Sequence, residues 1–252
     1  MENIIMPFII SMAISLFMTP IARKIAVKVG AIDIPKDERR VHKKPMPLMG
    51  GLAIYISIIV ASLIYLPVDK TLISIIVGGT LIFISGVIDD IKGLSPRVKL
   101  IFQIVAAIIL IFGDVKIDAI TNPFTKTSNL IELNGFSIPI TIFWVVGITN
   151  TLNLIDGLDG LAAGVAMIAS LSFLFVANKF NYLPVTIMSS IVGGSCLGFL
   201  PYNFNPAKIF MGDTGALFLG FMLAALSIEG VMKSVATIAV VVPIIILGVP
   251  IF

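Results

Sequence analysis

The chain has 252 residues, of which 58% are hydrophobic and 12% are charged, with a formal net charge of +3. The charged share is about half that of an average soluble domain, so the composition excludes a soluble enzyme, a disordered chain and a coiled coil. The single cysteine, Cys196, excludes an intrachain disulfide, and the small net charge gives no indication of nucleic-acid binding. Long unbroken apolar runs predict an all-α polytopic integral membrane protein rather than a β-barrel.

About nine hydrophobic spans are predicted within a single transmembrane domain, 1–252. They cover 4–20, 48–66, 71–88, 99–113, 139–154, 160–177, 184–200, 215–229 and 234–252. Several are shorter than the roughly 20 residues needed to cross a hydrocarbon core, so we expect the helices to extend into the adjoining loops.

The segment 114–138 is the one long loop predicted on the external side. It contains Asn134-Gly135, a dipeptide typical of two-residue hairpin turns, between Leu130–Leu133 and Phe136–Pro139. We therefore expect a small external β-hairpin there.

Basic residues predict the orientation. Arg23, Lys24 and Lys28 follow the first span and none precedes it, which is the reverse of a cleavable signal peptide. The positive-inside rule then places the N-terminus outside and the segments 21–47, 89–99, 155–159 and 201–214 inside. These segments hold 12 of the 17 Lys and Arg residues. We expect a multi-pass protein of the plasma membrane with a cytoplasmic site.

Five aspartates fall in the three short inside segments or at the span ends beside them: Asp89, Asp90, Asp156, Asp159 and Asp213. Carboxylates that share a site raise one another's pKa unless a cation neutralises them. Hard oxygen ligands favour Mg²⁺, which combines one or two carboxylates with substrate phosphates. Adjacent helix residues diverge by about 100°, so we expect one of Asp89 and Asp90 to face the shared centre. Each acid taken alone could also be a solvated helix end or an N-cap.

Polar residues recur every three positions at Asn150, Asn153, Asp156 and Asp159, a spacing that keeps them near one helical face. The two Asp-Gly steps predict a turn at which backbone can approach a ligand closely. An ordinary turn between spans is the alternative, but a turn does not require two asparagines inside an apolar span. We interpret this segment as part of a binding site.

Two further segments carry polar groups into spans. Asn203 to Gly215 opens the eighth span with Asp213 just before the helix, where it could hold a cation that bridges to phosphate or act as an N-cap. Arg39 to Gly51 leads into the second span, and its basic residues, including Lys43, could complement phosphates or simply enforce topology. His42 is the single histidine and has no partner histidine for a metal site.

Four segments, in this order, resemble the polyprenyl-phosphate N-acetylhexosamine-1-phosphate transferase superfamily: Pro47–Gly51, Asp89-Asp90, Asn150–Gly160 and Asn203–Gly215. Its members start wall teichoic acid and O-antigen synthesis, and include the phospho-MurNAc-pentapeptide translocase. The resemblance implies that undecaprenyl phosphate attacks the β-phosphate of a UDP-N-acetylhexosamine and that UMP leaves. It also implies Mg²⁺, with Mn²⁺ as a substitute, on the pyrophosphate. Phosphoryl transfer of this kind depends on positioning and charge neutralisation.

The resemblance also implies roles for individual residues. Asp213 matches the Mg²⁺ ligand, and Asp89 matches the acid that deprotonates or orients the lipid phosphate, with Asp90 beside it. Phe210 matches the residue that stacks on uracil. The expected catalytic residues are Asp89, Asp90 and Asp156, the metal ligand is Asp213, and the substrate-binding residues are Asn153, Asp159, Asn203, Phe210, Lys43 and Asn150.

Members of the superfamily continue into a cytoplasmic loop with a His-rich motif and one or two more spans, so we expect this chain to lack them. Leu48 stands where the pentapeptide translocase branch has Thr, which favours UDP-GlcNAc over UDP-MurNAc-pentapeptide. Direct attack is favoured over an aspartyl-phosphate intermediate. A cation-coupled transporter, whose acids would lie nearer the bilayer midplane, and an inactive scaffold are the alternatives. A homodimer is compatible with the sequence.

Overall fold

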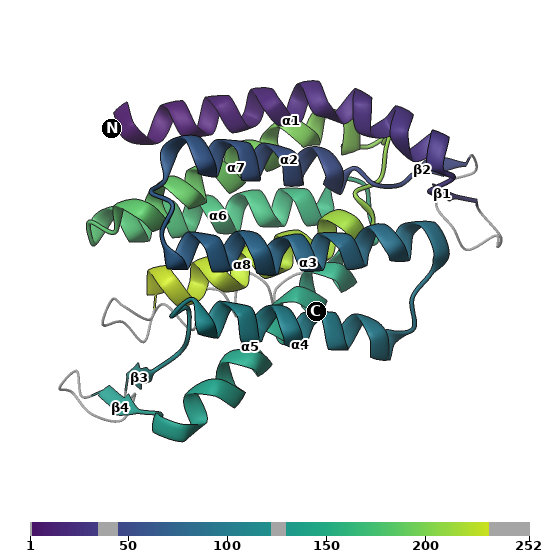
Figure 1. Ribbon diagram of the computed structural model, residues 1–252. Coiled ribbons are helices and arrows are strands. Elements are labelled where there is room, and N and C mark those ends of the chain that lie inside the picture. Colours follow the sequence, from purple (N-terminus) through teal and green to yellow (C-terminus); the bar gives the residue numbers. More distant parts are fainter. Residues whose placement is uncertain (1, 35–44, 122–129, 232–252) are drawn as a thin grey trace.

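The computed structural model describes residues 2–34, 45–121 and 130–231 (Figure 1). This part of the chain forms eight α-helices: α1 (Glu2–Val29), α2 (Gly51–Tyr65), α3 (Lys70–Lys92), α4 (Pro96–Phe112), α5 (Ser137–Ile155), α6 (Leu161–Lys179), α7 (Leu183–Asn203) and α8 (Gly212–Val231). Six helices within the described residues are long and apolar enough to cross a membrane, and α2 is a shorter apolar helix. Each of the first eight predicted spans falls on one helix, whereas the ninth, 234–252, lies outside the described residues.

Most helices overrun the predicted spans, and α1 does so most, whereas α2 is shorter than its predicted span. This helix continues to Val29, so Arg23, Lys24 and Lys28 lie on its last turns and not in a loop as predicted. Straight-chain basic residues and alanine are good helix formers, and long basic side chains reach the membrane surface from within a helix. The basic residues that begin at Arg23 therefore mark the edge of the apolar region and not the end of the helix.

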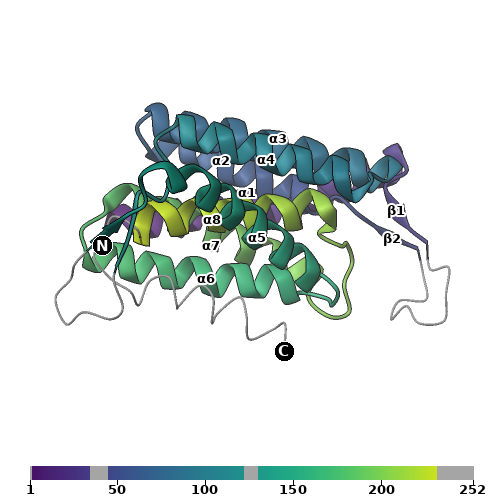
Figure 2. The ribbon, with the colours of Figure 1, turned by 90° about the horizontal axis from the view of Figure 1, so that it is seen from below.

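Helix α8 lies at the centre of the bundle. It packs against α3 and α5 most extensively, and also against α6, α2 and α7, while α1 packs on α7 and α2. Figure 2 shows α3 and α6 on opposite sides of α8. Phe218 and Phe221 of α8 are fully buried. A helix that is apolar all round is stable at such a central position.

The outer faces of the bundle are strongly apolar. Phe143 is 78% exposed, Leu154 is 80% exposed and Phe17 is 73% exposed. Large apolar side chains at this exposure are unfavourable in water and favourable against lipid tails. Together with the six long apolar helices among the described residues, they identify a multi-pass membrane protein.

Two short antiparallel pairs lie at opposite ends of the bundle (Figure 1). Strands β1 (Ile32–Asp33) and β2 (Met46–Pro47) pair with Asp33 opposite Met46 at one end. Strands β3 (Ala119–Thr121) and β4 (Leu130–Glu132) pair at the other end, with Ile120 opposite Ile131.

The hairpin turn predicted at Asn134-Gly135 is wrong. Asn134–Phe136 form a 3₁₀ turn that leads into α5, in which Phe136 donates its N–H to the carbonyl of Leu133 at 2.8 Å. Pro139 explains the difference, because proline has no N–H to donate to a sheet but is tolerated in the first turn of a helix. The strand that pairs with β4 precedes it in the chain instead of following it.

Candidate active site

A cavity of about 970 Å³ lies at the end of the bundle that carries β1 and β2. Its lining residues come from all four segments that the basic residues marked as inside. They are Asp33, Met46, Leu48, Asp89, Asp90, Asn153, Asp156, Gly157, Leu158, Asp159, Asn203, Asn205, Pro206, Ala207, Phe210, Gly212 and Asp213. Most of the predicted site residues therefore surround one space.

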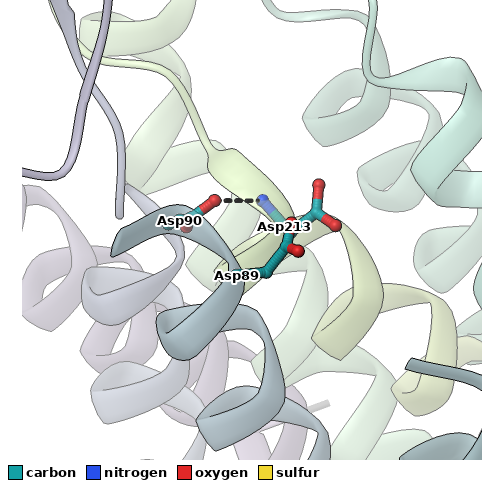
Figure 3. Close-up of side chains that lie close together, drawn as sticks. All are labelled: Asp89, Asp90 and Asp213. Atoms are coloured by element: carbon teal, nitrogen blue, oxygen red, sulfur yellow. Dashed lines mark hydrogen bonds between the residues drawn. The ribbon is translucent and has the colours of Figure 1, made fainter. Parts of the chain in front are cut away.

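Three carboxylates form an acid cluster at the edge of this cavity: Asp89, Asp90 and Asp213. Each offers an oxygen that lies within 4.8 Å of the other two. Asp89 and Asp90 stand on the last turns of α3, and Asp213 stands on the first turn of α8 rather than before it (Figure 3). Segments more than 120 residues apart in sequence thus meet at one point.

Asp90 caps the N-terminus of α8 from a neighbouring helix. Its carboxylate accepts hydrogen bonds from the backbone N–H of Asp213 at 2.9 Å, from the N–H of Thr214 at 3.1 Å and from the Thr214 hydroxyl. The first N–H groups of a helix have no partner within it, and the helix dipole favours a negative charge there. The interpretation of Asp213 as the N-cap is therefore wrong, because Asp90 supplies that function.

Asp89 and Asp213 are joined by Lys99 of α4. The Lys99 Nζ lies 2.7 Å from Asp89 Oδ2 and 2.5 Å from Asp213 Oδ2. Asp213 Oδ1 accepts a further bond from Asn153 Nδ2 at 3.1 Å, and Asp89 Oδ1 accepts the N–H of Leu94 at 2.6 Å. Both carboxylates are thus held in place by two groups from different positions in the chain.

The donor set of the acid cluster fits a divalent cation. It consists of hard carboxylate oxygens, and three carboxylates against the single ammonium of Lys99 leave excess negative charge when all are ionised. Mg²⁺ prefers oxygen ligands and binds through few carboxylates, completing its shell with water and phosphate oxygens. The residues that would hold it are Asp213 and Asp89, since the Asp90 carboxylate already caps α8.

Asp159 and Asn203 tie together two loops that line the cavity. Asp159 Oδ2 accepts bonds from Asn205 Nδ2 at 3.2 Å and from the N–H of Ala207 at 3.0 Å. Asn203 is 3% exposed; its Oδ1 accepts the N–H of Gly160, and its Nδ2 donates to the carbonyl of Ile209, both at 3.1 Å. These bonds hold the α5–α6 loop against the α7–α8 loop. Their contact with a nucleotide stays a prediction.

The Pro47–Gly51 segment is a backbone bracket for Phe210 and the start of α8. Phe210 donates its N–H to the carbonyl of Pro47 and accepts the N–H of Gly50, each at 2.9 Å, and Gly51 donates to the carbonyl of Met211 at 2.9 Å. A Cβ on Gly51 would overlap the backbone of Gly215. This segment therefore sets where the Phe210 ring meets the cavity.

Two of the predicted site residues are not found at the cavity: Asn150 lies elsewhere, and Lys43 is not described by the structure. Asn150 is not among the described residues that line the cavity, and its amide pairs with Gln103 of α4. Lys43 lies outside the described residues.

Sequence reasoning missed Lys99, because a lysine in an inside segment is the ordinary positive-inside signal. Its position one turn before another polar residue, Gln103, on an apolar helix was the available indication.

Gly212 has a left-handed backbone conformation, with φ of 71°, and packs against the Asp90 carboxylate. We expect Gly212→Ala to lower both stability and activity, because its Cβ would overlap the Asp90 carboxylate and displace the cap of α8. Gly30→Ala is the matched control, since Gly30 has φ of 80° but open space around it. Both variants carry a strain of about 1–2 kcal/mol. Equal activity of the two variants would contradict the proposed role of close packing at Gly212.

Asp156 ends α5 at the cavity, partly buried. Burial, and then the charges of Asp213 and Asp90, raise its pKa to about 7. The stability that this group contributes is complete below its ordinary pKa of 3.8 and is lost as the pH rises through about 7. Without divalent cations, we expect Asp156→Asn to raise the Tm by several degrees, and by more at pH 8 than at pH 5. An equal gain at both pH values would show that the Asp156 carboxyl does not titrate between them.

Comparisons with known proteins agree with this geometry. Glycosyl transferase family 4 matches residues 72–231. The chain is 46% identical over 255 residues to the probable undecaprenyl-phosphate N-acetylglucosaminyl 1-phosphate transferase of Bacillus subtilis, covering 100% of this chain and 70% of the relative. It is 37% identical over 231 residues to the decaprenyl-phosphate N-acetylglucosaminephosphotransferase of Mycolicibacterium smegmatis, covering 85% and 57%.

A third relative comes from another branch. The chain is 37% identical over 243 residues to the phospho-N-acetylmuramoyl-pentapeptide-transferase of Halalkalibacterium halodurans, covering 90% of this chain and 73% of the relative. The chain thus spans between 57% and 73% of the length of these three relatives. The matches confirm the resemblance carried by the four sequence segments, and the chain belongs to glycosyl transferase family 4.

Proposed function

We propose that the protein transfers GlcNAc-1-phosphate from UDP-GlcNAc to undecaprenyl phosphate and releases UMP, the first membrane step in the synthesis of a cell-wall polymer. The observation that carries this proposal is the acid cluster, whose carboxylates lie within 4.8 Å of one another at the edge of a large cavity. The cavity lies at the end of an apolar bundle, where a membrane-embedded lipid phosphate and a water-soluble nucleotide can meet. The names of the relatives support a polyprenyl phosphate as the acceptor and an N-acetylglucosamine phosphate as the group transferred.

The reaction is a direct displacement at phosphorus. A phosphate oxygen of undecaprenyl phosphate forms a bond to the β-phosphorus of UDP-GlcNAc, and the bond from that phosphorus to the oxygen bridging to the α-phosphate breaks. The oxygen leaves as part of UMP, and the lipid keeps the sugar through a new diphosphate. Mg²⁺, with Mn²⁺ as a substitute, would neutralise the charge of the diphosphate when bound to Asp213 and Asp89.

The chain's own groups orient the reactants. Asp89, whose carboxylate is fixed by Leu94 and Lys99, is assigned the role of accepting the acceptor's remaining proton or orienting its phosphate. Asp90 acts on the reaction by fixing the backbone of Asp213. Lys99 and Asn153 hold the Asp213 carboxylate from two sides. Catalysis of phosphoryl transfer depends chiefly on such positioning.

The wall of the cavity formed by the α5–α6 and α7–α8 loops is assigned to the nucleotide. Phe210 presents a ring for stacking on uracil, and Asn153 and Asp156 present polar groups toward the same space. Asp159 and Asn203 support this wall by holding its two loops together. Lys43 is assigned to the nucleotide by the sequence resemblance alone.

The proposal also includes the choice of donor and the orientation of the protein in the membrane. Leu48 lines the cavity, where the resemblance places a Thr in the pentapeptide translocase branch, so UDP-GlcNAc is favoured as donor. We place the cavity on the cytoplasmic side and the N-terminus outside, because the four segments that form the cavity hold 12 of the 17 basic residues.

The test is UMP release by the intact protein in membranes supplied with UDP-GlcNAc, undecaprenyl phosphate and Mg²⁺. We expect one UMP for each lipid-linked sugar formed, loss of the reaction with a chelator, and recovery with Mg²⁺ or Mn²⁺. Turnover of UDP-MurNAc-pentapeptide in place of UDP-GlcNAc would assign the protein to the other branch. Uptake of a substrate into vesicles without UMP release would indicate a transporter. Nucleotide binding without turnover would indicate an inactive scaffold.

A further inference from the structure

Gln103 of α4 and Asn150 of α5 form a reciprocal amide pair inside the bundle. Asn150 Nδ2 donates to Gln103 Oε1 at 2.6 Å, and Gln103 Nε2 donates to Asn150 Oδ1 at 3.2 Å. Asn150 Nδ2 also donates to the carbonyl of Val146 at 2.8 Å, which fixes its rotamer, and Gln103 is 1% exposed. The pair satisfies both amides in apolar surroundings, where unpaired amides are costly.

The same two helices carry the donors that hold Asp213. Lys99 precedes Gln103 by four residues on α4, and Asn153 follows Asn150 by three residues on α5, so each is one helical turn from the amide pair. Lys99 donates to Asp213 Oδ2, and Asn153 donates to Asp213 Oδ1. The amide pair and the Asp213 carboxylate therefore link α4 to α5 at two successive levels.

We propose that Gln103 and Asn150 are positioning residues, which fix the register of α4 against α5 and thereby hold Lys99 and Asn153 on the two sides of Asp213. A slip of α4 by one residue moves it about 1.5 Å along its axis and turns it by about 100°. Such a slip breaks both amide bonds at once. Apolar side chains around the pair tolerate small slips, whereas a buried polar contact specifies one register.

This inference gives Asn150 a role different from the substrate-binding role expected from the sequence. Asn150 is directed to α4 and not to the cavity, and both of its amide atoms are engaged. Its expected effect on turnover rests on the proposed function, because the groups it positions are those assigned to phosphoryl transfer. The register itself is a property of the two helices and can be measured separately.

The experiment compares three versions of the intact protein in membranes. The Gln103→Leu/Asn150→Leu variant replaces the amide pair with an apolar pair, and the Gln103→Asn/Asn150→Gln variant exchanges the two amides. Ser227→Ala is the control, because it breaks another bond of α5, from Trp144 Nε1 to Ser227 Oγ at 2.8 Å, far from the cavity. The readouts are kcat for UMP release, Tm, and the rate at which a water-soluble acylating reagent labels Lys99.

We expect the apolar pair to lower kcat by about 100-fold, the effect of a displacement of about 1 Å in a catalytic arrangement. Its Tm should stay near the wild-type value, because replacing both partners of a buried hydrogen bond is nearly neutral. Lys99 should be labelled several-fold faster, since it loses its place between Asp89 and Asp213. The exchanged amides should recover most of the rate, and Ser227→Ala should keep the wild-type kcat and labelling.

Wild-type kcat and wild-type Lys99 labelling in the apolar pair would overturn the inference. If that variant does not fold, Gln103→Met replaces it. A wild-type kcat together with wild-type labelling of Lys99 in Gln103→Met would also overturn the inference. If the wild-type protein releases no UMP, the proposed function fails, and the labelling of Lys99 in the same variants still decides whether the amide pair sets the register.

Discussion

Asp213→Asn is expected to reduce UMP release by about 1000-fold, the largest loss from any single substitution at this site. Asp213 is the acid that receives hydrogen bonds from both Lys99 and Asn153, and its backbone is fixed by Asp90. Asparagine keeps the shape and one of the two oxygens but removes the charge that would hold a divalent cation. The loss should appear in kcat and in the Mg²⁺ concentration for half-maximal rate, measured with saturating UDP-GlcNAc.

The matched control for Asp213→Asn is Asp114→Asn. Asp114 lies in the loop after α4, where its carboxylate pairs with Lys70 at 2.8 Å on an exposed surface. Its φ of 64° is a conformation that asparagine also adopts. We expect wild-type UMP release from this variant, since exposed ion pairs contribute little. Wild-type turnover by Asp213→Asn would refute the assignment of the acid cluster.

Lys99→Met is expected to lower kcat by about 100-fold and to lower the Tm of the metal-free protein by several degrees. The Lys99 ammonium lies between Asp89 and Asp213, and these partly buried carboxylates repel each other when it is removed. Mg²⁺ should restore most of the lost Tm, because a divalent cation at the acid cluster supplies the missing positive charge. Thermal unfolding with and without Mg²⁺ measures this difference.

Lys92→Met is the control for Lys99→Met. Lys92 is the last residue of α3, near the same cavity, but its side chain is exposed. A general loss of positive charge at the membrane surface would affect both variants alike. We expect Lys92→Met to keep the wild-type kcat and Tm, and an equal loss in both would show that Lys99 contributes through topology and not through its contact with the two aspartates.

Much of the site could be predicted from the sequence because span ends that carry acids must meet at a membrane surface. Asp89, Asp156 and Asp213 occupy three different segments, yet alternation of the spans places all three at the same end of the bundle. The eight described helices could also be predicted, because a long apolar run has few alternatives to a helix in a membrane.

The direction of individual side chains could not be predicted in this way. Asp90 turns to the N-terminus of α8 and Asn203 bridges two loops, and both arrangements depend on how distant elements pack. Lys99 escaped notice because its charge had an ordinary explanation in the topology. The turn at Asn134 was misplaced because the local dipeptide signal was given more weight than Pro139 three residues after Phe136.

The most direct test of the account is to locate a divalent cation in crystals of the protein grown with Mn²⁺ and UDP-GlcNAc, by anomalous scattering at the manganese edge. The account predicts one strong peak at the cavity edge, within bonding distance of the Asp213 carboxylate and beside Asp89. A peak elsewhere on the protein, with none at the acid cluster, would contradict the claim that this cluster holds the cation for phosphoryl transfer.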